Sequence, residues 1–125
     1  MQRVTGIGGI FFKARDPEAM CAWYQKHLGI DVLSWGGAVF NWHDANGQPT
    51  GGSTIWSISA KEGADDPAPF TINYRVADLD ALLAALREEG CTLVGQPQDG
   101  EYGKFGWVLD PEGNKVELWQ PRPGQ

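Results

Sequence analysis

The chain has 125 residues, a formal net charge of −6 and a pI near 4.7, with 42% hydrophobic and 21% charged residues. This length fits one domain or two small repeats that share a core, and the composition is that of an ordinary soluble globular protein. The acidic balance argues against nucleic acid, which binds basic surfaces, and mildly favours neutral or cationic ligands. No apolar run approaches the roughly 20 residues of a membrane span, and the N-terminus lacks the layout of a signal peptide.

The cysteine and tryptophan contents indicate the cellular location and the kind of surface to expect. Cys21 and Cys91 form neither a disulfide framework nor a zinc-ligand spacing, so we expect reduced thiols and a cytoplasmic protein. Six tryptophans are many for a chain of 125 residues. Because a buried indole N–H needs a partner, such a set typically lines a core edge, a cleft or an interface.

The first half of the chain predicts a strand followed by a helix. The strand covers residues 5–13, and its glycines suggest close approach by another backbone or a ligand. Asp16 is the expected N-cap of the helix, Pro17 its first residue and Gly29 the residue past its end. Apolar and aromatic residues at helical spacing predict its packed face: Met20, Trp23, Tyr24, His27 and Leu28.

Three further strands are predicted in this half, over residues 30–35, 38–42 and 53–59. Residues 43–47 have turn composition and residues 48–52 are a polar loop. Residues 61–69 contain two prolines, Gly63 and two adjacent aspartates, which is typical of a linker.

The second half repeats the order of the first. A strand over residues 70–76 precedes a helix that Asp78 caps and Gly90 ends, with its apolar stripe at Leu79, Leu82, Leu83 and Leu86. A short strand over residues 92–94 and a loop over residues 96–103 follow. The spacing from Asp16 to Gly29 is nearly the same as that from Asp78 to Gly90, and the turn sequence at 44–47 matches that at 110–113. Together these matches indicate an internal repeat of about 62 residues.

The chain closes with a predicted β-hairpin. One strand ends at Leu109, Pro111 and Gly113 are typical of the turn, and the second strand starts at Lys115. Alternation places Val116 and Leu118 on one face of that strand, and Glu117 and Trp119 on the other.

A strand, the sequence Asp-Pro-Glu-Gly-Asn and a strand that carries Glu117-Leu118 resemble the C-terminal signature of the glyoxalase / bleomycin-resistance / extradiol-dioxygenase (vicinal oxygen chelate) superfamily. The repeat extends this resemblance over nearly the whole chain. The implied fold is α+β, with two pseudo-repeated βαβββ units that form a curved eight-stranded sheet around a concave cleft, helices outside. We expect a single domain over 1–125, with repeat units at 1–60 and 70–125 and a linker at 61–69. The resemblance also implies a homodimer.

In metal-dependent members of that superfamily, four cleft positions supply His, Gln or Glu ligands. The positions that match are Gly9, Thr71, Thr54 or Trp56, and Glu117, of which only Glu117 is a competent ligand. His27 falls on a helix and His43 in a turn. One carboxylate cannot hold a divalent ion against water, so we expect no metal and no other cofactor.

Alternation from these positions predicts which residues line the cleft. Phe11, Trp56, Asn73, Arg75, Trp107 and Trp119 are the expected ligand-binding residues, and Glu117 is the candidate catalytic residue. An aromatic lining with a few orienting polar groups is typical of a small-molecule site. An ion pair between Arg75 and Glu117 is the structural alternative to a catalytic role.

Three functions follow. The first is a metal-free protein, similar to the bleomycin-resistance branch, that binds an aromatic or cationic small molecule. The second is an enzyme in which Glu117 acts as general acid or base on a small carbonyl compound, with isomerase or lyase chemistry. The third retains a divalent metal through Glu117 and ligands such as His43 or Asp44, supplied in part by a second subunit.

Overall fold

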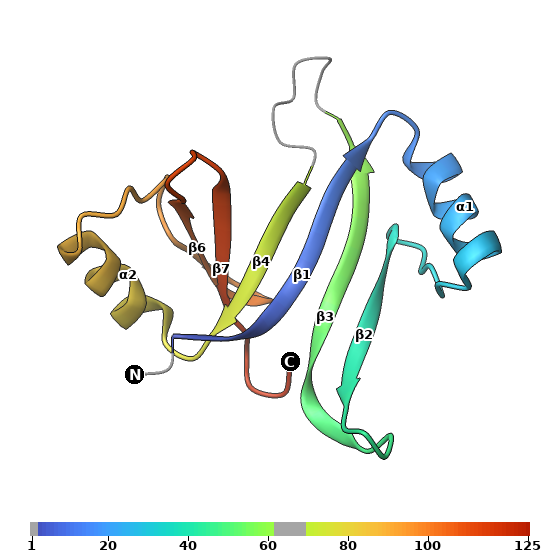
Figure 1. The fold of residues 1–125 in the computed structure, drawn as a ribbon, viewed down its shortest axis with the longest axis horizontal. Coiled ribbons are helices and arrows are strands. Elements are labelled where there is room, and N and C mark those ends of the chain that lie inside the picture. The colour runs from blue at the N-terminus through green and yellow to red at the C-terminus, as the bar shows by residue number, and fades with distance from the viewer. Residues whose placement is uncertain (1–2, 62–69) are drawn as a thin grey trace. The chain divides into compact units, whose positions relative to one another are not determined.

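The structure is a computed structural model that describes residues 3–61 and 70–125, and this part of the chain forms two helices and seven strands (Figure 1). The elements in chain order are β1 (Val4–Ala14), α1 (Pro17–Leu28), β2 (Gly37–His43), β3 (Pro49–Ala60), β4 (Phe70–Val76), α2 (Leu79–Glu88), β5 (Gln98–Gly100), β6 (Gly103–Leu109) and β7 (Lys115–Gln120). The strands pair both in parallel and antiparallel, and the helices are segregated from them, so the predicted α+β class is confirmed.

The chain divides into two compact units, each with one helix. One unit spans Gly9–Thr71, and the other combines the described residues up to Gly8 with Ile72–Gln125. The division passes through β1, so the first strand contributes to both units. The repeat predicted from sequence ran continuously through 1–60, whereas the first residues of the chain group with the second half.

In the unit Gly9–Thr71, β3 is the central strand. It pairs in parallel with β1, from Gly9 opposite Ile55 to Ala14 opposite Ala60, and antiparallel with β2. In the unit that holds the C-terminal half, β7 has the equivalent place. It pairs in parallel with β4 and antiparallel with β6, which in turn pairs with β5. The same arrangement therefore occurs twice, as the internal repeat predicts.

Both helices begin and end where the sequence indicates. The Asp16 and Asp78 carboxylates accept the backbone N–H groups of Ala19 and Ala81 at 3.0 and 3.1 Å, which satisfies donors that a helix leaves unpaired. Gly29 ends α1 with φ of 69°, and Gly90 follows α2 with φ of 85°, a left-handed conformation that glycine adopts without strain.

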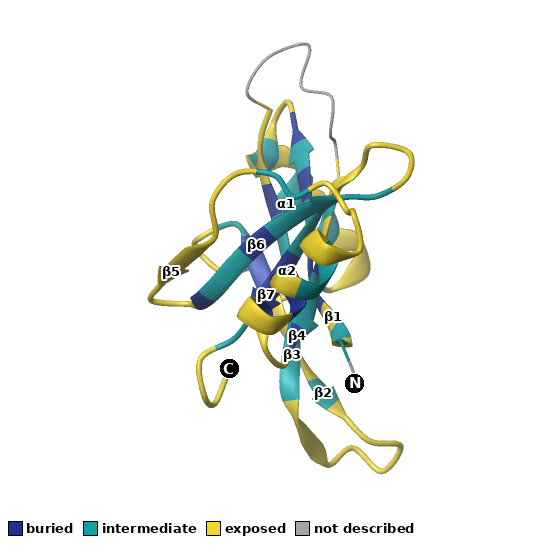
Figure 2. Ribbon diagram, turned by 90° about the vertical axis from the view of Figure 1, so that its left-hand side faces the viewer, coloured by how far each residue is buried: buried dark blue, intermediate teal, exposed yellow. Residues whose placement is uncertain are grey.

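Each helix covers one side of its own strands. Leu79, Leu82 and Leu83 of α2 pack on Val76 and Leu118, with Leu86 against them, so the predicted stripe is confirmed. In Figure 2, where the ribbon is coloured by burial, the visible surface of α2 is mostly exposed. Under α1 the core is smaller and consists of Phe12, Ala14 and Ile58 with Tyr24 and Trp56 packed against it. The predicted face of α1 is only partly correct, because Trp23 and Leu28 are 51% and 60% exposed.

The two hairpin turns use the same hydrogen bonds, which explains the repeated sequence. Oδ1 of Asp44 accepts from the backbone of Asn46 and Gln48, and Oδ1 of Asp110 accepts from Glu112 and Asn114. Asp110 also accepts from the Asn114 side chain, and these bonds hold the pKa of its carboxyl below the usual value.

The strand predictions need four corrections. Residues 30–35 form no strand, because Leu33 is in a turn: its N–H donates to the carbonyl of Gly37, and its carbonyl accepts from the N–H of Gly36. Residues 92–94 contribute only one bridge, from Leu93 to Val108, since glycines with positive φ flank them at 90 and 95. The predicted loops yield strand instead at residues 98–100 and 49–52, so the described residues have seven strands rather than eight. Of the predicted linker, only Lys61 lies within the described residues.

Candidate functional site

The candidate site lies on the side of β4, β6 and β7 that faces away from α2. Leu118 packs under the helix, so the alternation of β7 turns Glu117 and Trp119 to the opposite side. The register continues this side into the neighbouring strands, with Asn73 and Trp107 opposite Glu117, and Arg75 and Phe105 opposite Trp119. We call these six residues the Glu117 face.

The carboxylate of Glu117 is held by a side-chain donor from each neighbouring strand. Nδ2 of Asn73 donates to Oε1 at 2.7 Å, and the indole Nε1 of Trp107 donates to Oε2 at 2.9 Å. A carboxylate has about four acceptor positions, so these two bonds fix its orientation and leave acceptor capacity for a ligand.

The indole ring of Trp119 lies on the same face of β7 as this carboxylate. Its Nε1 donates to the backbone carbonyl of Tyr102 at 2.7 Å, and only 7% of the residue is exposed. Phe105 stacks on it with ring centroids 6.1 Å apart and planes 9° apart, and the Arg75 guanidinium lies 5.1 Å from its ring. Trp119 is therefore fixed by a hydrogen bond, a stacked ring and a cation.

The side chain of Arg75 lies over the Trp119 ring and extends toward the C-terminal residue. Its Nη2 donates to the backbone carbonyl of Gln125 at 2.8 Å, and partial burial lowers the pKa of the guanidinium. Asn73 occupies the position opposite Glu117 and supplies the hydrogen bond. The predicted ion pair of Arg75 with Glu117 stays a prediction.

Gly8 of β1 allows this packing. A Cβ atom at Gly8 would lie 2.2 Å from Oδ1 of Asn73 and 2.9 Å from the Trp119 ring, distances that real Cβ atoms do not reach. The sequence predicts close approach of another backbone or a ligand at the β1 glycines, whereas the atoms that approach Gly8 belong to the side chains of Asn73, Arg75 and Trp119. Phe105 was not predicted, although its alternation with Trp107 in β6 is a signal for it.

Asn73 is the most buried polar residue of the face, with 1% of its surface exposed. Its Nδ2 donates to Glu117, whereas its Oδ1 accepts no hydrogen bond from the described residues. A buried acceptor without a donor costs free energy, so this atom is a marked feature of the site.

The remaining predicted ligand-binding residues, Phe11 and Trp56, lie in the unit Gly9–Thr71. Phe11 is on the side of β1 opposite to the core residue Phe12. Trp56 packs edge-on against Phe12 and Tyr24 under α1, with centroids 5.6 and 5.1 Å apart. The predicted orientation of Trp56 and Thr54 is therefore wrong, because Ile55, not its neighbours, pairs with Gly9 and shares its side of the sheet.

The residues at the four superfamily ligand positions do not fit a metal ion. Gly9 has no side chain, Thr71 carries only a neutral hydroxyl and Trp56 packs in the core, so Glu117 is left as a single carboxylate. His27 lies 5.2 Å from the Trp23 ring on α1, and His43 ends β2. Across residues 3–61 and 70–125, no three His, Cys, Asp or Glu side chains come together as a metal site.

Neither described helix is long and apolar enough to cross a membrane.

Among solved structures, the chain is similar to a methylmalonyl-CoA epimerase of Mycobacterium tuberculosis, with 21% identity and a TM-score of 0.65 over 98% of this chain and 92% of that one. A variant of the Streptomyces coelicolor methylmalonyl-CoA epimerase, in complex with 2-nitronate-propionyl-CoA, gives 20% identity and a TM-score of 0.71 over 98% of both chains. A structure described as an NAD-dependent benzaldehyde dehydrogenase of Legionella pneumophila gives 13% identity and a TM-score of 0.61 over 91% of this chain and 98% of that one.

The TM-scores of these three comparisons show a shared fold. No curated protein matches the sequence. The model of one protein family matches residues 6–118, from β1 through Leu118 of β7, and so includes both repeats and the hairpin signature. The chain belongs to the Glyoxalase/Bleomycin resistance protein/Dioxygenase superfamily.

Proposed function

We propose that the protein binds a small organic molecule through the Glu117 face, without a metal ion. The observation that carries this proposal is the Glu117 carboxylate, which Asn73 and Trp107 hold from both sides next to the fixed ring of Trp119. A rigid anion beside aromatic rings is suited to a ligand that has an aromatic body and an amine or ammonium group.

Two further features support a cationic group in the ligand. The acceptor capacity that remains on Glu117 can take a charge-assisted hydrogen bond, which is about twice as strong as a neutral one. The rings of this face also attract cations within the protein itself, with Lys115 5.7 Å from Trp107 and Arg75 5.1 Å from Trp119.

The test compares 2-phenylethylammonium with its uncharged analogue 2-phenylethanol, by calorimetry and by the indole N–H resonances of Trp107 and Trp119. We expect the ammonium ion to bind about tenfold tighter or more, since one charge-assisted hydrogen bond contributes about 1.5–3 kcal/mol. In Glu117→Gln this preference should disappear. Glu112→Gln removes the same charge from the exposed turn of the same hairpin and should retain it. Equal binding of the two compounds, or a preference that survives Glu117→Gln, would refute the proposal.

A second candidate function is proton transfer by Glu117, and the fixed orientation of its carboxylate favours it. Glu117 would take a proton from the carbon next to a carbonyl group, the resulting enolate would regain a proton from solvent, and Glu117 would release its proton to solvent. The structurally similar epimerases suggest methylmalonyl-CoA as the probe. In D₂O, exchange at its α-carbon that is lost in Glu117→Gln would support this function, and exchange no faster than in buffer would exclude it for this substrate.

The homodimer that the resemblance implies, and a cytoplasmic location, stay predictions.

A further inference from the structure

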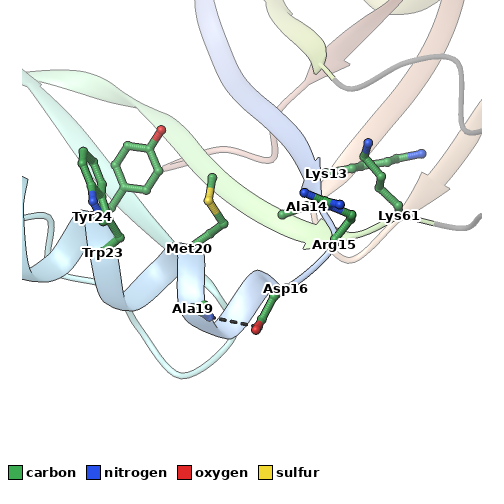
Figure 3. Close-up of a pocket in the computed structure, with 9 residues that line it drawn as sticks. All are labelled: Lys13, Ala14, Arg15, Asp16, Ala19, Met20, Trp23, Tyr24 and Lys61. Atoms are coloured by element: carbon green, nitrogen blue, oxygen red, sulfur yellow. Dashed lines mark hydrogen bonds between the residues drawn. The ribbon is translucent and has the colours of Figure 1, made fainter. Parts of the chain in front are cut away.

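A groove in the unit Gly9–Thr71 has a different chemistry from the Glu117 face. It measures about 690 Å³ and lies between the end of β1 and the first turns of α1 (Figure 3). Cationic side chains form one side of it and apolar side chains the other. We call it the α1 groove and define it by Lys13, Arg15, Lys61, Met20, Trp23 and Tyr24.

The cations gather because of the strand register. β1 and β3 run in parallel and end together, with Ala14 opposite Ala60, and the Lys61 N–H donates to the carbonyl of Ala14 at 3.1 Å. Lys61 is therefore placed beside Lys13 and Arg15, and Figure 3 shows the three side chains together at one end of the groove.

Charges within the groove favour an anion. Among the described residues that line it, the one acidic residue is Asp16, which turns its carboxylate to the N–H of Ala19 and away from the cations (Figure 3). Within the described part of the chain, the side chains of Arg15 and Lys61 form no ion pair with a carboxylate. In a protein of net charge −6, Arg15 and Lys61 therefore supply local positive charge in the described part of the chain.

The opposite side of the groove offers aromatic surface. Tyr24 is anchored in the core, because its ring lies edge-on to Phe12 and Trp56 at 6.0 and 5.1 Å. Trp23 packs against Tyr24 at 5.1 Å and remains 51% exposed, so part of its indole ring is available to a flat ligand. Met20 fills the space between this side and the core.

We infer that the α1 groove binds an aromatic organophosphate, of the chemical class of a nucleoside phosphate. Guanidinium and ammonium groups are the usual partners of phosphate oxygens, and an exposed indole is a stacking surface for a base. The volume lies within the range of drug-sized ligand sites. An anion with an aliphatic chain would contact the cationic side chains but would not stack on the flat ring of Trp23.

The test titrates the full chain by calorimetry with ADP, adenosine, pyrophosphate and octyl phosphate, in buffer without magnesium. ADP should bind tighter than adenosine, which lacks the phosphates, and tighter than pyrophosphate, which lacks the base, by about tenfold or more in each case. The double variant Arg15→Ser, Lys61→Ser should lose about tenfold in ADP affinity, and Trp23→Ala should reduce it similarly. These residues are exposed, so the fold should be retained.

Lys26→Ser is the matched control, because it removes an exposed cation from the same helix outside the groove and should change ADP affinity by less than about twofold. Absence of ADP binding, or equal loss in Lys26→Ser, would overturn the inference. Pyrophosphate binding as tight as ADP would reduce the groove to an adventitious anion site, and tighter binding of octyl phosphate would contradict an aromatic ligand. All four outcomes are independent of Glu117.

Discussion

At the scale of single residues, Glu117 owes its orientation to donors on two different strands. Asn73 and Trp107 are adjacent to it in the register, and each uses its side-chain N–H on a different carboxylate oxygen. Any replacement of Glu117 therefore leaves two donors that need an acceptor. The unpaired Oδ1 of Asn73 decides which replacements are tolerated.

Glu117→Gln should preserve stability to within about 1 kcal/mol, because one oxygen still accepts from Trp107 and rotation of the Asn73 amide lets Oδ1 accept from the new N–H₂ group. Glu117→Leu has no acceptor and should destabilise the protein by about 2–4 kcal/mol. Urea denaturation of the two variants beside wild type measures this difference. Equal losses would show that the hydrogen bonds contribute little, and that packing alone holds the face.

The orientation of single residues was predictable on β7 and not on β3. On β7, the turn at residues 110–113 fixes where the strand starts, so alternation correctly separates Glu117 from Leu118. On β3, glycines at 51 and 52 both have positive φ, and the pairing with β2 shifts between Asn41 and His43. These irregularities break the alternation, and the sequence has no signal for the resulting orientation of Trp56.

At the scale of elements, turn and cap chemistry made the helices and the final hairpin predictable. Asp16, Asp78 and Asp110 each accept local backbone N–H groups, and such bonds depend on short-range sequence alone. The error at residues 30–35 has the opposite origin. Its apolar residues are suited to a strand, but none of the described strands pairs with them, and pairing is a tertiary property.

The turn at Asp110 predicts a pH dependence of stability. Its folded-state pKa lies below the unfolded value, with the Asn114 side chain as the largest cause, so its contribution is present above the unfolded pKa and is lost as the pH falls through the folded pKa. The stability advantage of wild type over Asp110→Ala should therefore be larger at pH 7 than at pH 2 to 3.

Asp110→Asn is the control for this comparison. Its side-chain oxygen still accepts from Glu112 and Asn114 but cannot ionise, so the difference between Asp110→Asn and Asp110→Ala should stay nearly constant with pH. Urea midpoints measured from pH 7 downward test both statements. An advantage of wild type over Asp110→Ala that stays unchanged across this range would contradict the role assigned to the carboxylate.

At the scale of the whole molecule, the fold was predictable from the internal repeat. The sites were only partly predictable, because they depend on how the strands pair. Both repeats place a central strand between a parallel and an antiparallel neighbour. Most of the Glu117 face follows from that plan. The α1 groove does not, because Lys61 meets Lys13 and Arg15 only through the parallel pairing of strand ends 46 residues apart, at Ala14 and Ala60.

The central claim is that Glu117 acts as a carboxylate held by Asn73 and Trp107, and not as a metal ligand. The most direct test is the metal content of the protein, purified without chelators or an affinity tag, beside Glu117→Ala. We predict far less than one divalent ion per chain in both proteins, because one carboxylate cannot hold such an ion against water. About one ion per chain in wild type, lost in Glu117→Ala, would contradict the claim and support metal-dependent chemistry.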